Sequence, residues 1–314
     1  MLKPKEQLMN KLIITVLVGV LCNITISAML NTQANAKTIH SERSLYRNIL
    51  VEEKRGLRCL KFNVKSSKTQ QSCMLVKDPN KLVFNYTKML FASLLLNPNP
   101  ERILIIGLGG GTMSNTLQQL FPKSSITNVE IDPAVIKVAK KYFNFVENDQ
   151  VTSVVQDGRI FVKRAVLKKQ KYDWIILDAF NGDYIPEHLM TKEFLQETKQ
   201  LLSDNGVLAA NTFSVSELYH HESATYKSVF GDFFNVSTKK NSNRIILVSK
   251  KTLPHKSTLA SRVLALVSKL VPFNVNIAEI NRQITSTKTT QDWPKDTRLL
   301  TDQYSPANLL NLEN

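Results

Sequence analysis

With 314 residues, of which 43% are hydrophobic and 21% charged, the chain can bury a sizeable core, which excludes collagen-like, low-complexity and largely disordered proteins. Its three cysteines are too few for a disulfide-rich scaffold, and it has no Cys-x-x-Cys or Cys/His cluster, so we expect no metal. The net charge of +15 is spread over short lysine pairs, which favours a solvated basic surface, and we expect no nucleic-acid partner.

Residues 1–36 have the pattern of a targeting segment. Lysines precede the apolar run Leu12–Cys22, and small and polar residues follow up to Ala-Asn-Ala at 34–36. This order predicts a secretory signal peptide. The alternative is a signal anchor, in which residues 12–30 tether the protein to the membrane. In both cases we expect the rest of the chain to be exported, either free in the periplasm or anchored at the inner membrane and facing the periplasm.

Residues 37–85 are predicted to form a small β-strand domain. Strands are expected at Asn48–Val51, Arg58–Val64, Ser72–Val76 and Leu82–Phe84. A polar stretch between the second and third strands indicates a hairpin with its turn near Ser66. Cys59 and Cys73 would then lie opposite each other, and an oxidising periplasm favours a disulfide between them. The alternative is a pair of free thiols.

Residues 86–250 are predicted to form the main domain, which a helix at Tyr86–Leu96 opens. Apolar strands are expected at Ile103–Ile106, Ser125–Glu130, Val151–Val155, Trp174–Leu177, Val207–Asn211 and Arg244–Val248. Amphipathic helices are expected between them at Thr112–Leu120, Ala134–Tyr142, Ile160–Lys168 and Lys192–Leu202. This alternation predicts an open, doubly wound parallel sheet. Residues 251–314 are predicted to form a C-terminal helix, at Leu259–Leu270, and a tail that is loose at Ile280–Thr297.

Glycines cluster directly after the first strand of the predicted sheet. Gly107, Gly109 and Gly111 let the backbone turn sharply and approach a ligand closely, at a helix N-terminus with free N–H groups. A glycine turn alone is a weak signal, because such turns end many parallel strands. Its meaning depends on the residues at the ends of the later strands, where ligands bind in such sheets.

Acidic residues end the following strands at the same edge of the sheet. Glu130 is placed to accept hydrogen bonds from the two hydroxyls of a ribose. Asp157 and Gly158 follow the third strand, where a carboxylate and a backbone amide can contact an adenine edge, and Asp178 ends the fourth strand. Each carboxylate alone is equally well read as a helix cap or a loop salt bridge. Their joint placement predicts a nucleoside site.

The order of these motifs resembles the spermidine synthase (polyamine aminopropyltransferase) family, and most of all its bacterial spermidine-synthase-like branch. The likeness covers roughly residues 44–250, and the tail Leu-Thr-Asp-Gln-Tyr-Ser-Pro at 300–306 also has close counterparts. It implies an α/β fold, the Rossmann-like fold of S-adenosylmethionine-dependent methyltransferases, with a small N-terminal β-hairpin domain. It also implies a homodimer, although no segment marks an interface.

The resemblance implies a transferase that moves an aminopropyl group from a nucleoside donor to an unknown amine. The donor would be decarboxylated S-adenosylmethionine or S-adenosylmethionine. The family roles that carry over are the ribose contact of Glu130, the adenine contacts of Asp157 and Gly158, the catalytic carboxylate Asp178, and substrate contacts of Tyr86, Gln71 and Asp183.

The sequence departs from the family at the amine side of the expected site. Gly110 stands where the glycine loop usually carries an Asp, Arg47 replaces an early Gln, and Asn181 replaces the second acid of Asp-x-x-Asp. The family's Tyr-His-Glu ends here in Lys88. A diamine needs negative charge at its far nitrogen, because a desolvated ammonium without a partner is costly. Methyl transfer from S-adenosylmethionine and a non-catalytic nucleoside-binding protein of the envelope are therefore the alternatives.

Three further features are weaker candidates. A positioning role is expected for His188, while His220 and His221 are expected in a solvent-facing loop. In the tail, Asp302 and Tyr304 either fold back over the crevice or cap a helix.

Overall fold

The computed structural model describes residues 36–62, 70–180, 184–213, 217–238 and 243–310. The chain divides into two compact units, residues 1–37 and 38–314, and the second contains the fold. The expected leader lies outside the described residues up to residue 35, as do the turn near Ser66, Asn181 and Asp183. Within the described ranges, no helix is both long enough and apolar enough to cross a membrane.

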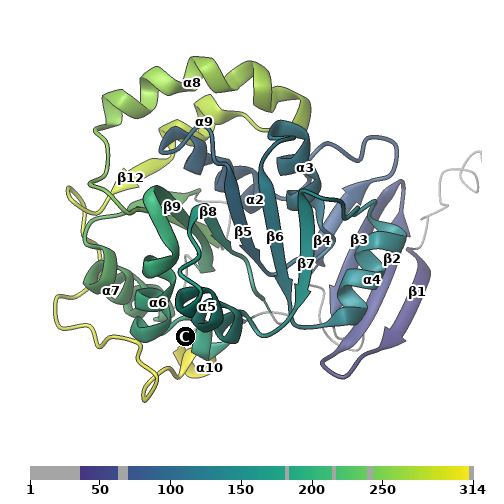
Figure 1. Cartoon of the computed structure of the whole chain (residues 1–314), viewed down its shortest axis with the longest axis horizontal. Coiled ribbons are helices and arrows are strands. Elements are labelled where there is room, and N and C mark those ends of the chain that lie inside the picture. The colour runs from purple at the N-terminus through teal and green to yellow at the C-terminus, as the bar shows by residue number, and fades with distance from the viewer. Residues whose placement is uncertain (1–35, 63–69, 181–183, 214–216, 239–242, 311–314) are drawn as a thin grey trace, which may run out of the picture. The chain divides into compact units, whose positions relative to one another are not determined.

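The first sheet is small and comes from the N-terminal part of the second unit (Figure 1). It contains β1 (Lys37–Arg43), β2 (Asn48–Lys54), β3 (Leu57–Phe62) and β4 (Gln70–Leu75), in that order. Its inward side chains, among them Ile49, Leu60 and Phe62, pack against Val135 and Val138 of the main fold. The sequence pattern did not predict β1, because its residues are mostly polar.

The expected strand at Leu82–Phe84 is wrong. Leu82 makes a single antiparallel bridge with Met74, and helix α2 (Asn85–Leu90) begins directly afterwards. Too few residues lie between the turn that follows β4 and the start of α2 to form a strand.

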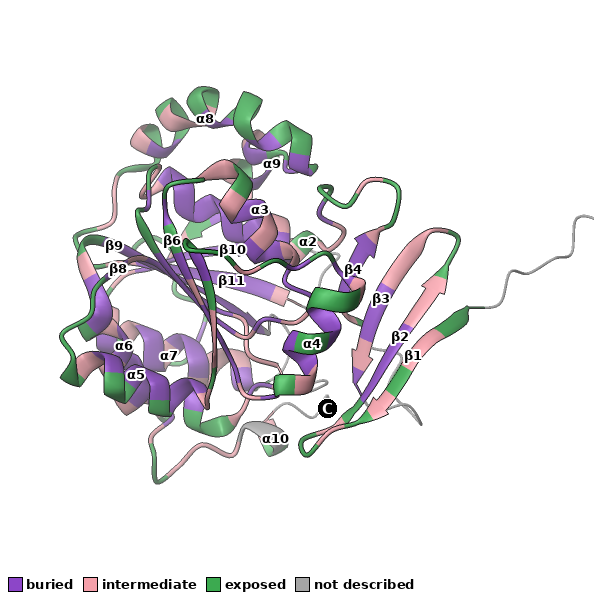
Figure 2. Ribbon diagram, turned by 45° about the vertical axis from the view of Figure 1, so that its right-hand side comes forward, coloured by how far each residue is buried: buried purple, intermediate pink, exposed green. Residues whose placement is uncertain are grey.

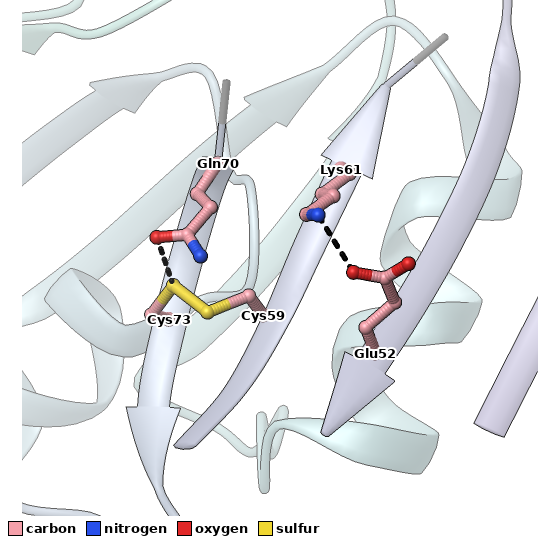
Figure 3. Close-up of a disulfide and its surroundings, with 5 residues drawn as sticks. All are labelled: Glu52, Cys59, Lys61, Gln70 and Cys73. Carbon is pink, nitrogen blue, oxygen red and sulfur yellow. Dashed lines mark hydrogen bonds and ion pairs between the residues drawn. A yellow bond between two sulfur atoms is a disulfide. The ribbon is translucent and has the colours of Figure 1, made fainter. Parts of the chain in front are cut away.

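The hairpin between β3 and β4 has the expected register. Cys59 pairs with Cys73 across the two antiparallel strands, and their sulfur atoms form a disulfide. Figure 3 shows the bond beside Gln70, the first residue of β4. Both cysteines are buried, so the disulfide is shielded from solvent.

The second sheet has eight strands in the order β12-β10-β11-β9-β8-β5-β6-β7. The strands are β5 (Arg102–Ile106), β6 (Ser125–Glu130), β7 (Val151–Val155), β8 (Tyr172–Leu177), β9 (Leu202–Phe213), β10 (Phe234–Ser237), β11 (Asn243–Ser249) and β12 (Ile284–Ser286). Those from β5 to β9 are parallel, whereas β10, β11 and β12 are paired antiparallel. The predicted fully parallel sheet is therefore wrong for the last strands. Strands β10 and β11 pair antiparallel, and the apolar pattern of a strand does not record its direction.

Helices cover both faces of this sheet (Figures 1 and 2). The helical elements besides α2 are η1 (Phe91–Leu95), α3 (Thr112–Leu120), α4 (Pro133–Tyr142), α5 (Gly158–Leu167), η2 (Glu187–Leu189), α6 (Lys192–Leu201), α7 (Leu218–Phe230), α8 (Lys256–Leu270), η3 (Val271–Phe273), α9 (Ile277–Arg282) and α10 (Ala307–Leu310). Successive residues of β5 point to opposite faces: Ile103 and Ile105 pack with α2, α3, α8 and α9, while Leu104 and Ile106 pack with α5, α6 and α7.

Two expectations about the C-terminal half are corrected. His220 and His221 lie in α7 rather than in a loop. The segment expected to be loose contains the end of α9 and β12, because Ile277, Ile280 and Ile284 are all buried in the core.

Candidate active site

A cavity of about 560 Å³ opens at the carboxyl ends of the parallel strands. Its walls include predicted site residues from both sheets, namely Gly107, Gly109, Glu130, Asp157, Gly158, Asp178, Tyr86 and Gln71. The volume lies in the range that small-molecule sites occupy. The structure therefore brings the expected residues together around one hollow, which distinguishes a site from a set of unrelated caps.

The glycine turn after β5 lies against the backbone that follows β8, a neighbour of β5 in the sheet. Gly107 has φ 98°, and a Cβ atom there would lie 2.3 Å from the carbonyl oxygen of Asp178. Gly111 is not one of the lining residues; it caps α3 with φ 71°, and a Cβ atom there would collide with the ring of Phe145. The turn thus needs glycine both for its left-handed backbone and for close packing.

Gly110 faces strand β4 of the small sheet. A Cβ atom at this position would lie 2.7 Å from Ser72 Oγ and 3.1 Å from the ring of Phe143. The turn of this chain therefore has no room for the acid that the family carries there, unless Ser72 moves.

Glu130, the last residue of β6, is held by the backbone of two neighbouring turns. Its Oε2 accepts a hydrogen bond from Leu108 N, and its Oε1 accepts one from Asp132 N, each over 3.1 Å. Burial raises the pKa of its carboxyl, although these two hydrogen bonds and the charge of Arg47 act in the opposite direction. Each oxygen keeps further acceptor capacity for a ligand hydroxyl.

Asp157 is the N-cap of α5 as well as a wall of the cavity. Its Oδ1 accepts hydrogen bonds from Arg159 N and Ile160 N over 3.0 Å, and its Oδ2 lies 2.8 Å from His188 Nε2. The hydrogen bond with His188 is the largest cause of a lowered pKa of this carboxyl. The cap fixes Asp157, and His188 faces it from η2.

Asp178 directly follows β8 and is partly exposed to the cavity. Asn211 Nδ2 donates a hydrogen bond to its Oδ1 over 2.8 Å, and the hydroxyl of Tyr86 is also hydrogen-bonded to it. Desolvation raises the pKa of Asp178 to about 7, with both hydrogen bonds acting against that rise. A carboxylate with such a pKa can accept a proton at neutral pH.

Arg47 places a positive charge in the wall of the cavity. The side chain is 8% exposed, and its guanidinium lies 4.4 Å from the centroid of the Phe62 ring. Its Nη1 donates to the carbonyl oxygen of Phe180 over 3.4 Å, and its Nε lies 3.8 Å from Asp132 Oδ2. Lys88, by contrast, is not a lining residue.

The tail lies beside the site instead of over it. Arg159 Nη2 donates to Asp302 Oδ2 over 2.7 Å, and Ser305 Oγ donates to the carbonyl oxygen of Glu187 over 3.1 Å. Asp302 and Tyr304 line a shallow hollow next to His188 and are not lining residues of the main cavity. The tail therefore contacts η2 and the start of α5 from outside.

Sequence reasoning missed Asn211 and Asn243, which both line the cavity. The signal that identified the acids applies to Asn211 as well, because it is a polar residue near the carboxyl end of a central strand. His220 and His221 lie outside the cavity, and His221 Nδ1 contacts the carbonyl oxygen of Arg298 instead. In the described part of the chain, no group of three or more His, Cys, Asp or Glu is arranged to hold a metal ion.

Comparisons with known proteins agree with this geometry. The family model of the spermine/spermidine synthase domain matches residues 83–241. A polyamine aminopropyltransferase of Vibrio vulnificus (strain CMCP6) is 51% identical over 275 residues, which are 87% of this chain and 91% of that protein.

Two solved structures share the fold. A probable spermidine synthase from Corynebacterium glutamicum ATCC 13032 has a TM-score of 0.65 and 21% identity, and the match covers 84% of this chain and 96% of that one. The spermidine synthase from Thermotoga maritima has a TM-score of 0.59 and 23% identity, with 78% and 83% of the two chains covered. The expected Rossmann-like α/β fold with an N-terminal β-sheet is confirmed.

Proposed function

This chain belongs to the spermine/spermidine synthase family, and on that premise we propose that it transfers the aminopropyl group of decarboxylated S-adenosylmethionine to a primary amine. The observation that carries the proposal is the convergence of Glu130, Asp157 and Asp178 on one cavity at the carboxyl edge of the sheet. Both enzymes and binding proteins use such an edge, but an acid in a cavity wall whose pKa is raised to about 7 by desolvation favours a catalytic site.

The nucleoside is proposed to lie along the strand ends from β6 to β7. Glu130 would accept hydrogen bonds from the ribose hydroxyls, since each of its oxygens accepts only one backbone hydrogen bond among those described. Asp157 Oδ2 and the backbone amide of Gly158 would contact the adenine edge. The reactive carbon of the aminopropyl group would then face Asp178.

Asp178 is proposed to act as the general base. It would accept a proton from the bound ammonium of the acceptor, which frees the nitrogen lone pair. The lone pair then attacks the carbon next to the sulfonium, the new C–N bond forms as the C–S bond breaks, and the sulfur leaves as the neutral thioether of methylthioadenosine. The carboxyl afterwards returns its proton to solvent.

The experiment compares Asp178→Asn with the parent protein. With decarboxylated S-adenosylmethionine and putrescine, we expect kcat/KM to fall by about 10²–10⁴-fold, while the affinity for methylthioadenosine in calorimetry changes little. Asp149→Asn is the matched control, because Asp149 is an exposed residue outside the cavity. Full activity of Asp178→Asn would remove Asp178 from the role of base.

Methyl transfer from S-adenosylmethionine is the second candidate. It is favoured by the absence of an acidic side chain at Gly110, where Ser72 and Phe143 leave little room for one. Without an acid in the glycine turn, the amino group of decarboxylated S-adenosylmethionine has lost one counter-charge, whereas the amino group of S-adenosylmethionine is accompanied by that molecule's own carboxylate. The products distinguish the two reactions. Methylthioadenosine in the product mixture supports aminopropyl transfer, and S-adenosylhomocysteine supports methyl transfer.

We also propose that the protein is exported. The charge and apolar pattern of residues 1–36 supports this, and so does the buried Cys59–Cys73 disulfide, because disulfides persist in oxidising compartments. A phosphatase that is active only outside the cytoplasm, fused after residue 314, should be active in cells. An inactive but intact fusion would contradict export.

A further inference from the structure

Three side chains from neighbouring strands form a chain of hydrogen bonds that ends at Asp178. Asn243, the first residue of β11, donates from Nδ2 to Asn211 Oδ1 over 3.1 Å. Asn211, on β9, donates in turn from Nδ2 to Asp178 Oδ1 over 2.8 Å. All three residues line the cavity, and Asn211 is only 3% exposed. Both bonds run in the same direction, toward the carboxylate.

The direction of this chain matters because an amide has a donating end and an accepting end. With its NH₂ group toward Asp178, Asn211 stabilises the ionised carboxylate. Rotated by half a turn, it would present its oxygen, which repels a carboxylate but accepts a hydrogen bond from a protonated carboxyl. The amide orientation of Asn211 is therefore coupled to the protonation state of Asp178.

The side-chain N–H group of Asn243 favours the orientation in which the NH₂ group of Asn211 faces Asp178. This N–H group needs an acceptor, and Asn211 Oδ1 can serve only while the NH₂ group of Asn211 faces Asp178. Asn243 is half-buried, and loss of its hydrogen bond to Asn211 Oδ1 would cost free energy, so rotation of Asn211 is opposed. Backbone pairing of β11 with β9, in which Ile245 lies opposite Asn211, keeps the two amides at a fixed separation.

We infer that Asn243 is a positioning residue for the transfer reaction: acting through Asn211, it keeps the catalytic carboxylate of Asp178 ready to accept a proton. This inference rests on the proposed role of Asp178 as base. It assigns Asn243 no contact with the reacting atoms. Other charged or titratable residues also line this cavity, namely Tyr46, Arg47, Tyr86, Glu130, Asp157, Tyr184, Glu187 and His188.

The first test measures the pKa of Asp178 directly, so that it does not depend on turnover. In protein with ¹³C-labelled aspartate, the carboxyl shift of Asp178 is followed against pH and assigned with Asp178→Asn. Asn243→Leu should raise this pKa by about 0.5–1 unit, which is the effect of one hydrogen bond. Asn243→Ser, which keeps an O–H donor, should restore most of the difference. An unchanged pKa in Asn243→Leu would overturn the inference.

The second test separates positioning from direct substrate contact. The acidic limb of the kcat profile should move to higher pH in Asn243→Leu by the same shift, with KM for donor and acceptor within about twofold of the parent. In an Asn211→Leu background, the additional Asn243→Leu change should have no further effect on the limb. A rise in KM that persists in that background would overturn the inference.

The two proposals fail in different ways. If the parent protein forms no aminopropyl product, the proposed function fails, while the carboxyl titration still tests the link from Asn243 to Asp178. If Asn243→Leu does not fold, Asn243→Ala replaces it, with the same expected pKa shift and with thermal unfolding as the check of folding.

Discussion

The surroundings of Asp178 have opposite effects on its ionised form. Hydrogen bonds from Asn211 and Tyr86 favour its ionised form, whereas desolvation disfavours that form and is the larger effect, so its pKa rises to about 7. For folding alone, a neutral side chain at this position would give a more stable protein than an ionised carboxylate. The raised pKa agrees with the role proposed for Asp178, that of a base at neutral pH.

This pKa predicts how stability depends on pH. The ordinary pKa of the group is 3.8 and its folded value is about 7, so the folded state holds the proton more tightly. Stability from this group is complete below pH 3.8 and is lost as pH rises through about 7. Asp178→Asn does not titrate, and we expect it to exceed the parent's free energy of unfolding by a few kcal/mol at pH 8 and by almost nothing at pH 4.

Urea denaturation at both pH values measures this difference. Asp149→Asn should follow the parent at both, because Asp149 is exposed. Equal stabilities of the parent and Asp178→Asn at pH 8 would contradict the raised pKa.

The short helix η2 is held by contacts from distant parts of the chain. It has only three residues, and its His188 contacts Asp157 from outside the main sheet. The tail secures it, since Ser305 binds the carbonyl of Glu187 and Asp302 pairs with Arg159. The pairing lowers the pKa of Asp302, so the ion pair is present at neutral pH. The tail therefore supports the end of the cavity at which the nucleoside is proposed to lie, without lining it.

We predict that Asp302→Asn weakens donor binding and leaves the chemical step intact. KM for the donor should rise by about 3–10-fold, with kcat within twofold, because His188 and Asp157 are positioned less firmly while Asp178 is untouched. Steady-state kinetics with the donor varied measures both values. Asp296→Asn is the matched control, since Asp296 is an exposed acid in the same segment of the chain. A loss confined to kcat would refute this role of the tail.

The elements also show what the sequence could and could not predict. The carboxyl ends of parallel strands meet at one edge, so Glu130, Asp157 and Asp178 were predictable as neighbours from their positions after apolar runs. The direction of β11 could not be predicted from the sequence, because antiparallel and parallel strands have the same apolar pattern. Asn243 was missed for that reason: it begins its strand, and only antiparallel pairing brings that end to the site.

At the scale of the whole second unit, both sheets form the cavity. Gln71 and Ser72 of β4 face the glycine turn of the large sheet, and a core shared with α4 holds the small sheet in place. The disulfide from Cys59 to Cys73 joins β4 to β3 next to these lining residues. The small sheet is thus part of the site, and its stability contributes to the shape of the cavity.

Loss of the disulfide should lower stability more than it lowers activity. The bond closes a short loop with a sequence separation of 14, and such a loop contributes about 3 kcal/mol by constraining the unfolded chain. The double variant Cys59→Ser/Cys73→Ser should therefore unfold at a temperature several degrees lower, whereas kcat below that temperature stays within about threefold because the register of β3 and β4 also rests on backbone pairing. Calorimetry of reduced protein provides the control: because the bond is buried, the parent is reduced in denaturant and refolded with reductant, after which it should unfold at the temperature of the variant, while the same treatment leaves the variant unchanged. A parent protein that unfolds at the same temperature as the variant under oxidising conditions would show that the bond contributes no stability.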